Sequence, residues 1–215
     1  MNTVLLIILI ILGIPVLLLL NLITVVKLVR KIYPFPIPQF MTEFIDNPVR
    51  RKYWQKPDQI AQRTGAFPGA VVVEVGPGKG SYTKAVAKRI GSEGIVYAID
   101  IQQSILDRLQ ERLDKAEIKN IIPKLDDAYD LDFENNSVDI IFAITCLPEI
   151  PEPVKVLKEF RRILKPGGTI SFCELFLDPD YPFRRTEKKW AFEAGLVLKE
   201  EFGNWFSYQL NFSKE

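Results

Sequence analysis

The chain contains no histidine and only two cysteines, and these two shortages exclude several classes of catalytic and metal site. Without histidine there is no Ser-His-Asp triad, no Cys-His dyad and no His-ligated zinc site. Two cysteines are too few for an all-cysteine zinc site or a disulfide scaffold. We therefore expect no metal centre, and any chemistry has to rest on carboxylates, tyrosines, lysines, backbone dipoles or a cofactor.

Net charge is also nearly absent, because 28 basic side chains face 27 acidic ones and give a formal charge of +1. A chain this close to neutrality is not typical of proteins that bind phosphate backbones, so we expect no nucleic-acid partner. The charges are unevenly distributed, since residues 1–26 carry no ionisable side chain. This contrast divides the chain into two physically different regions.

The first region is apolar almost throughout, from Val4 to Val26. As a helix it spans roughly 34 Å, which is enough to cross a hydrocarbon core of about 30 Å. A cleaved signal peptide would need a basic start and a shorter apolar core, and a buried helix of the following domain is the other alternative. We expect residues 1–32 to be a transmembrane anchor with its basic flank, which makes the lipid bilayer a partner.

The flanks of this segment predict its orientation. Lys27, Arg30 and Lys31 follow the apolar run, whereas no basic side chain precedes it. The positive-inside rule then predicts a single-pass protein of the cell membrane with its catalytic domain in the cytoplasm. In that compartment Cys146 and Cys173 should stay reduced.

Residues 33–56 are expected to form a proline-rich linker and a capping segment, since proline recurs at positions 34, 36 and 38. Tyr53-Trp54, together with Tyr181, are candidates to cover a pocket, although ordinary aromatic packing explains them equally well. The basic pairs Arg50-Arg51 and Arg184-Arg185 are expected to be solvated, with anionic lipid as the alternative.

Residues 57–215 alternate between strand-like and helix-like patterns. The expected strands are 70–75, 95–99, 120–125, 138–144, 169–177, 197–202 and a half-exposed 206–213, and the expected helices are 81–90, 105–113, 154–164 and 183–194. Such repeated units predict an α/β fold with a mostly parallel sheet and helices on both faces. Ligands of such folds bind beyond the carboxyl ends of the strands.

A glycine loop follows the first of these strands, with Gly76, Gly78 and Gly80 at alternate positions. Glycine lets the backbone turn tightly and approach a ligand, and the next helix points its N–H groups at the same place. Asp100 ends the second strand, where a carboxylate can accept the hydroxyls of a ribose. A dinucleotide fold would have a small third residue in G-x-G-x-x-G, where this chain has Ser81.

These residues resemble those of a known family. The run Glu74-x-Gly76-x-Gly78-x-Gly80 resembles motif I of the class I S-adenosylmethionine-dependent methyltransferases, and Asp100 matches their ribose-binding acid. The segments 127–133, 137–142 and 157–168 are similar to their adenine segment, fourth strand and following helix. The closest branch includes the ubiquinone/menaquinone C-methyltransferases. The resemblance implies a Rossmann-like sheet of seven strands in the order 3-2-1-4-5-7-6, with the last strand antiparallel.

The resemblance also implies a cofactor, S-adenosyl-L-methionine, and a set of residues around it. The three loop glycines would surround its methionine part, Asp100 would hold the ribose, and Ile101 would pack on the adenine. The remaining candidates are Glu74, which would order the loop, Asp127 and Ala128 at the adenine, and Thr145 after the fourth strand.

Glu149 is the candidate for a catalytic role, because a carboxylate near a sulfonium can attract a cationic acceptor or take its proton. A helix cap before Pro151 is the alternative, and Cys146 is expected to be a small buried residue rather than a nucleophile. We expect a membrane-anchored methyltransferase for a hydrophobic or lipid-like small molecule. The alternatives are an alkyl-thiol or protein methyltransferase, an NAD-dependent reductase, and a non-catalytic membrane scaffold.

Overall fold

The computed structural model describes residues 46–214 and, between 11 and 29, a series of separate positions that are helical and exposed. No helix among these described residues combines the length and the hydropathy that a bilayer crossing requires. The proline run and most of the expected anchor, residues 1–32, lie outside the described residues. The continuous part of the chain that the structure describes begins at Asp46.

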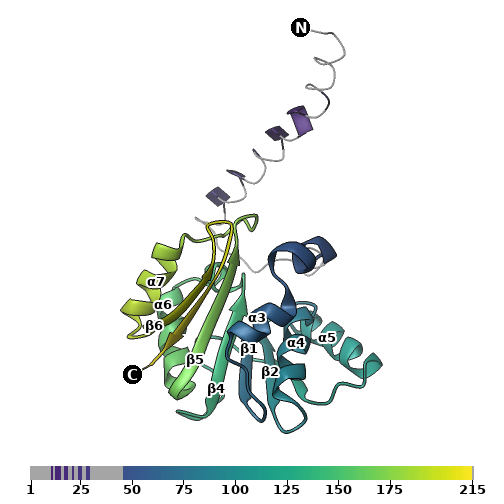
Figure 1. The fold of residues 1–215 in the computed structure, drawn as a ribbon, viewed down its shortest axis with the longest axis vertical. Helices are drawn as coiled ribbons and strands as arrows, with labels where there is room; N and C mark the ends of the chain where they lie inside the picture. The colour runs from purple at the N-terminus through teal and green to yellow at the C-terminus, as the bar shows by residue number, and fades with distance from the viewer. Residues whose placement is uncertain are drawn as a thin grey trace.

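One seven-stranded sheet organises the domain, in the order β3-β2-β1-β4-β5-β7-β6 (Figure 1). All neighbours are parallel except β7, which is antiparallel to both β5 and β6. This is the expected order and direction, and the prediction is confirmed. The strands are β1 (Val71–Val75), β2 (Ile95–Asp100), β3 (Ile121–Leu125), β4 (Val138–Ile144), β5 (Leu164–Leu175), β6 (Val197–Gly203) and β7 (Ser207–Ser213).

Helices cover both faces of this sheet. On one face lie α3 (Pro57–Arg63), α4 (Ser81–Ile90) and α5 (Gln103–Lys115), and on the other lie α6 (Pro153–Ile163) and α7 (Arg184–Glu193). Strand β4 shows why two cores form, because its side chains alternate between them: Ile140 and Phe142 join the α4 side, whereas Ile141 and Ala143 join the α6 side. A strand buried on both faces reads as a nearly continuous apolar run, as β4 does apart from Asp139 near its start.

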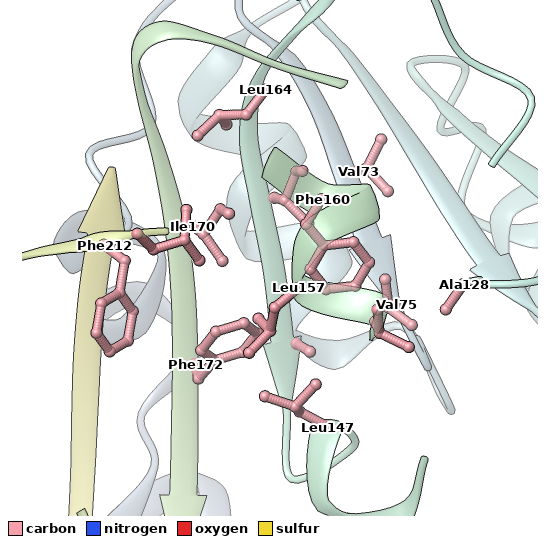
Figure 2. Packing of buried hydrophobic residues seen from close by; sticks show 14 of the residues in the cluster. Val73, Val75, Ala128, Leu147, Leu157, Phe160, Leu164, Ile170, Phe172 and Phe212 are labelled. Carbon is pink, nitrogen blue, oxygen red and sulfur yellow. The ribbon is translucent and has the colours of Figure 1, made fainter. Parts of the chain in front are cut away.

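The larger core lies between the sheet and α6. Figure 2 shows Leu157 and Phe160 of α6 directed at Phe172 of β5 and at Val73 and Val75 of β1. The rings of Phe160 and Phe172 are stacked with centroids 6.5 Å apart. This packing fixes β1 and β4 side by side, and the cavity described below opens at their carboxyl ends.

The expectation that the last strand is half exposed is wrong. Gln209 and Asn211 of β7 are as buried as the apolar residues between them. Helix α3 lies against this polar side, and the side chains complete its last turns: Asn211 Nδ2 donates to the Arg63 carbonyl at 2.6 Å, and Gln209 Nε2 to that of Ile60 at 3.4 Å. The polar residues that alternate along β7 therefore donate hydrogen bonds to carbonyls at the end of α3, and they do not mark a strand face that is exposed to solvent.

Of the expected linker and capping segment, 33–56, the structure describes residues 46–56. A short π-helical turn, η1 (Arg50–Trp54), precedes α3. Arg50 is only 3% exposed, so the expectation that it lies on a solvated basic face is wrong. Its neighbour Arg51 instead contacts the Asp46 side chain, at 2.6 Å.

Candidate cofactor site

The glycine loop joins β1 to α4 with all three glycines in left-handed backbone conformations, at φ of +71°, +52° and +79°. At Gly76 a side chain is also excluded by space, because a Cβ there would lie 2.5 Å from the Cys146 Sγ. At Gly78 a Cβ would have no neighbour within 4 Å, so only the backbone conformation demands glycine. The loop thus exposes main chain at the end of β1, which is what a closely bound ligand requires.

Gly80 serves the packing of the domain. It occupies the N-cap position of α4, and a Cβ there would lie 2.5 Å from the Leu109 side chain of α5. It does not line the cavity described below, so its expected contact with the cofactor stays a prediction.

Asp100 stands half-buried at the carboxyl end of β2. Its Oδ1 accepts a hydrogen bond from the Gln102 backbone N–H at 2.9 Å, which orients the carboxylate. Burial raises the pKa of Asp100 to about 6, against the lowering effect of the backbone donors. The adjacent Ile101 is 57% exposed, so it presents apolar surface against which a flat ligand could pack.

A tight turn after β3 supplies the next part of the site. Asp127 Oδ1 accepts from the Tyr129 backbone N–H at 3.0 Å, and Asp126 Oδ1 accepts from that of Asp127 at 3.0 Å. Ala128 is buried between them. The turn brings two carboxylates and the Tyr129 ring to the same edge of the sheet as Asp100.

Thr145 directly follows β4, and its backbone lies at φ +51°. A β-branched residue in this region is an outlier that costs on the order of 1–3 kcal/mol. Two contacts hold it: the Thr145 N–H donates to the Cys173 carbonyl at 2.9 Å, and the Arg50 guanidinium donates to the Thr145 hydroxyl at 2.9 Å. Strain of this kind concentrates at functional sites, and here it lies at the centre of the cavity.

The turn after Thr145 places Cys146 and then Glu149 at the cavity. Burial, and after it the Glu149 carboxylate, raises the pKa of the Cys146 thiol well above its usual value. The thiol therefore stays protonated, but Cys146 is half-buried and lines the cavity, so the expectation that it is a fully buried residue is wrong. Glu149 ends the short helix η2 (Leu147–Glu149), whereas the N-cap of α6 is Glu152. Glu149 is therefore not the residue that caps α6.

These segments enclose one cavity of about 340 Å³, a volume typical of small-molecule sites. It lies beyond the carboxyl ends of β1, β2 and β4, where the strand order reverses, as in other doubly wound folds. Of the residues that the sequence nominates, the lining contains Gly76, Gly78, Asp100, Ile101, Asp127, Ala128, Thr145 and Glu149. Tyr53, Trp54 and Tyr181 are not part of this lining.

Glu74 is the nominated residue that lies beneath the cavity rather than in its wall. It is 1% exposed, and its Oε2 accepts no hydrogen bond from the described residues. Burial raises the pKa of Glu74 to about 8, although the Thr83 hydroxyl opposes the rise. A protonated side chain next to the glycine loop suits a supporting role, and its expected effect on the loop stays a prediction.

Sequence reasoning missed the part of the wall that comes from the amino-terminal segment, namely Asp46 and Arg50. Asp46 Oδ2 accepts from the Ser81 hydroxyl at 2.5 Å, and the Asp46 carbonyl accepts from Lys79 Nζ at 3.1 Å. Burial lowers the pKa of Arg50, but Asp178, 3.5 Å away, and further groups, among them Asp46, together outweigh the effect of burial, so the pKa is raised and the guanidinium stays charged. No local pattern identifies these residues, because their partners are far along the chain.

The electrostatic character of the cavity is mainly acidic. Asp46, Asp100, Asp126, Asp127 and Glu149 line it, against the two cations Arg50 and Lys79. An excess of carboxylates suits a cationic ligand such as a sulfonium. Among the described residues there is no group of three or more Cys, Asp or Glu side chains arranged to hold a metal ion.

The residues present therefore fit S-adenosylmethionine. Exposed main chain at Gly76 and Gly78 can receive the amino-acid part, Asp100 presents carboxylate oxygens for the ribose hydroxyls, and the turn after β3 meets the adenine. The acidic wall compensates the positive sulfur. Fold and site together define the class of Rossmann-like proteins that bind this cofactor.

Comparison with known proteins leads to the same class. Residues 72–168 match the family model described as a methyltransferase domain. A demethylmenaquinone methyltransferase from Staphylococcus aureus (strain MRSA252) is 33% identical over 125 residues, which are 58% of this chain and 50% of that protein. The chain thus spans about half the length of the curated relatives it matches.

Solved structures share the fold. A SAM dependent methyltransferase from Aquifex aeolicus superposes with a TM-score of 0.75 at 23% identity, over 82% of this chain and 98% of that one. An N-methyltransferase of Haemonchus contortus, solved with phosphomonomethylethanolamine and S-adenosylhomocysteine, gives 0.60 at 22% identity, over 69% and 39% of the two chains. The sequence match over residues 72–168 is to a methyltransferase domain, and these comparisons support the expected enzyme class and the expected cofactor, S-adenosylmethionine.

Proposed function

We propose that this chain transfers the methyl group of S-adenosylmethionine to a hydrophobic or lipid-like small molecule, and that residues 1–32 anchor it in the cell membrane with the catalytic domain in the cytoplasm. The observation that carries the methyltransferase assignment is the single cavity that joins the glycine loop, Asp100 and the turn after β3 to the strained Thr145. It combines a cofactor cradle with an adjoining wall for an acceptor.

The cofactor supplies a methyl group that is already activated by the positive sulfur, and the protein has to align an acceptor and exclude water. Positioning of this kind lowers a barrier by roughly 7–11 kcal/mol without a strong base. The lack of histidine is therefore no obstacle. Glu149 is the cavity carboxylate we assign to the acceptor end, where its oxygens hold the proton that the acceptor releases.

Arg50 and Thr145 would form the opposite wall of the acceptor end. The Arg50 guanidinium is fixed by the Thr145 hydroxyl at 2.9 Å and by Gln55 Oε1 at 2.5 Å. A fixed cation at the acceptor end favours an acceptor oxygen that carries negative charge, such as a phenolate. A Cys146 thiol that stays protonated leaves no competing thiolate in the same cavity.

Three observations support the substrate class. The cavity wall includes the apolar residues Ile101, Ile105 and Ile150, which favour an apolar molecule. The relative from S. aureus is named for a quinone acceptor, although only half of that protein is matched. The apolar run from Val4 to Val26 would keep the enzyme at the bilayer, where a lipid-like acceptor is concentrated.

The test is methyl transfer by the full chain in vesicles. We expect label from methyl-labelled S-adenosylmethionine to enter the lipid extract when a hydrophobic quinol is present, and to be lost in Asp100→Ala. Asp107→Ala is the matched control, because Asp107 is an exposed carboxylate of α5 that does not line the cavity and accepts a hydrogen bond from Gln103 of the same helix at 2.8 Å. Label found only in protein would refute the substrate class.

The same assay separates the remaining candidates. A panel of alkyl thiols distinguishes a thiol methyltransferase, and titration with NAD distinguishes a reductase. A scaffold would bind no cofactor or would not turn over. Glu149→Gln should lower kcat at unchanged cofactor affinity, and an unchanged kcat would exclude Glu149 from proton transfer.

The anchor has its own test. A chain that spans the bilayer stays with the membrane in alkaline carbonate, whereas a peripheral chain is extracted. Proteolysis of sealed vesicles then reports which side carries the catalytic domain. Complete extraction by carbonate would refute the anchor and leave the methyltransferase assignment untouched.

A further inference from the structure

Six aromatic side chains from three separate segments form a continuous surface, which we name the aromatic face: Trp54, Phe176, Tyr181, Phe183, Trp205 and Phe206. Ring centroids of successive members lie 5.4 Å apart for Trp54–Phe206, 5.7 Å for Trp205–Phe206, 5.3 Å for Phe176–Trp205, 5.5 Å for Phe176–Tyr181 and 6.0 Å for Tyr181–Phe183. The segments are η1, the connection from β5 to α7, and the β6–β7 hairpin.

The aromatic face is open to solvent. Trp205 is 70% exposed and Phe183 71%, and the neighbouring Leu177 is 46% exposed. Single exposed apolar residues are ordinary, but large rings in mutual contact form a patch of the kind that marks an interaction site. Nothing in the described part of the chain covers it.

Cations flank the aromatic face at both ends. At one end, α7 continues from Phe183 into a shallow basic hollow lined by Arg184, Arg185, Lys188 and Lys189, against two carboxylates, Glu193 and Glu201. At the other end, Lys52 lies over the exposed Tyr53 ring at 5.2 Å from its centroid. Positive charge beside exposed tryptophan and tyrosine is the chemistry of surfaces that enter the headgroup region of an anionic membrane.

The place of the aromatic face in the fold agrees with this partner. The hairpin between β6 and β7 and the segment after β5 lie at the carboxyl edge of the sheet, the edge at which the cavity also opens (Figure 1). The chain enters the domain from residues 1–45 at Asp46, shortly before η1 and Trp54. An anchor in that stretch would deliver this edge, rather than the opposite one, to the bilayer.

We propose that the aromatic face is a bilayer-docking surface: its rings enter the interface, and the α7 cations bind anionic lipid headgroups. The inference rests on the proposed function and goes beyond it, because it orients the domain. The cavity then opens towards the membrane, so that a lipid-like acceptor reaches Glu149 without crossing water. Trp205 and Phe183, as the most exposed members, should lie deepest.

The experiment uses the full chain in vesicles with phosphatidylserine and lipids brominated near the glycerol end, which quench nearby tryptophans. The chain has three tryptophans, so two single-tryptophan variants serve as a matched pair. Trp54→Phe with Trp190→Phe keeps Trp205, and Trp54→Phe with Trp205→Phe keeps Trp190, a partly buried residue of α7 that packs against the core. We expect Trp205 to lose most of its fluorescence and Trp190 to lose little.

Charge and ring contributions are measured by substitution. Arg185→Ala and Lys189→Ala should each weaken docking by about 5-fold, and neutral lipid should weaken docking of the unsubstituted chain by more than either substitution, because it removes the attraction of all the α7 cations together. Phe183→Ala should reduce the quenching of Trp205. Phe67→Ala should not, since Phe67 is 47% exposed but precedes β1 at the opposite edge of the sheet.

Equal quenching of Trp205 and Trp190 would overturn the docking surface, whether or not the chain resists carbonate extraction. A doubled mass in vesicles with Trp205 unquenched would identify a second copy as the occupant and would also overturn it. Neither result changes the methyl-transfer assay, so failure of the docking surface is distinguishable from failure of the proposed function.

Discussion

The substitution Gly76→Ala tests the construction of the cofactor loop most directly. Gly76 combines a left-handed backbone, φ +71°, with a contact that leaves no room for a side chain, since a Cβ would lie 2.5 Å from the Cys146 Sγ and 3.0 Å from its Cβ. Both atoms belong to Cys146, which lies two residues after the end of β4 and immediately before η2, in a tightly packed turn.

The expected magnitude has two parts. An alanine in the left-handed region costs about 1–2 kcal/mol, and overpacking a tight contact costs about 1–3 kcal/mol. Their total of roughly 2–5 kcal/mol corresponds to a fall in Tm of about 10 °C for a domain of this size. Because the clash displaces the loop from the cavity, affinity for S-adenosylmethionine should fall as well.

The assay is thermal unfolding together with isothermal titration of the cofactor. Gly69→Ala is the matched control, since Gly69 has φ +81° but no atom within 4 Å of a Cβ, so it reports backbone strain alone. In a double-mutant cycle, Cys146→Ala removes the closest atom and should recover about 1–2 kcal/mol of the Gly76→Ala loss. The reasoning is refuted if Gly76→Ala costs no more than Gly69→Ala and shows no coupling to Cys146.

Three further predictions follow from the buried polar groups. Asp100→Asn should weaken cofactor binding by roughly 10–100-fold in a titration, because a hydrogen bond to a charged group contributes about 1.5–3 kcal/mol. Since burial raises the pKa of Asp100 to about 6, the unsubstituted chain should bind more weakly as pH falls through 6, while the variant should show no such change. Burial also raises the pKa of Glu187 to about 8, whereas the same carboxyl group in the unfolded chain ionises near 4.5. Between these two pH values the folded state keeps the proton and the unfolded state releases it, so the free energy of unfolding falls as pH rises. Urea unfolding should therefore show Glu187→Gln gaining on the unsubstituted chain by up to about 1.4 kcal/mol per pH unit from pH 5 to pH 8, and parallel curves would contradict this. Asn211→Leu leaves the Arg63 carbonyl without its donor and should cost about 1–3 kcal/mol in the same measurement, whereas an unchanged midpoint would show that water replaces the amide.

The order of the elements and the loop chemistry could be read from the sequence alone. Strands buried on both faces, such as β4, show as short apolar runs, and α5 shows as a stripe of leucines at helical spacing. These patterns depend on neighbours within a few positions, so a local reading suffices. In the same way, the glycine loop between a strand and a helix, together with Asp100 at the end of the next strand, predicted the cofactor.

What the tertiary structure alone decided are the contacts between distant segments. Asn211 is buried because α3, some 150 positions away, needs a donor at its last turn, and Arg50 becomes part of the cavity wall through the Thr145 hydroxyl, 95 positions away. Burial of a polar side chain depends on which segment packs over it. When that segment is distant in sequence, the periodicity of the local residues does not predict it. The sequence by itself therefore determined the sheet, the four helices α4 to α7 and the loop expected to hold the cofactor, whereas packing decided where η1 and α3 lie, which charged groups line the cavity and which aromatic rings face outward.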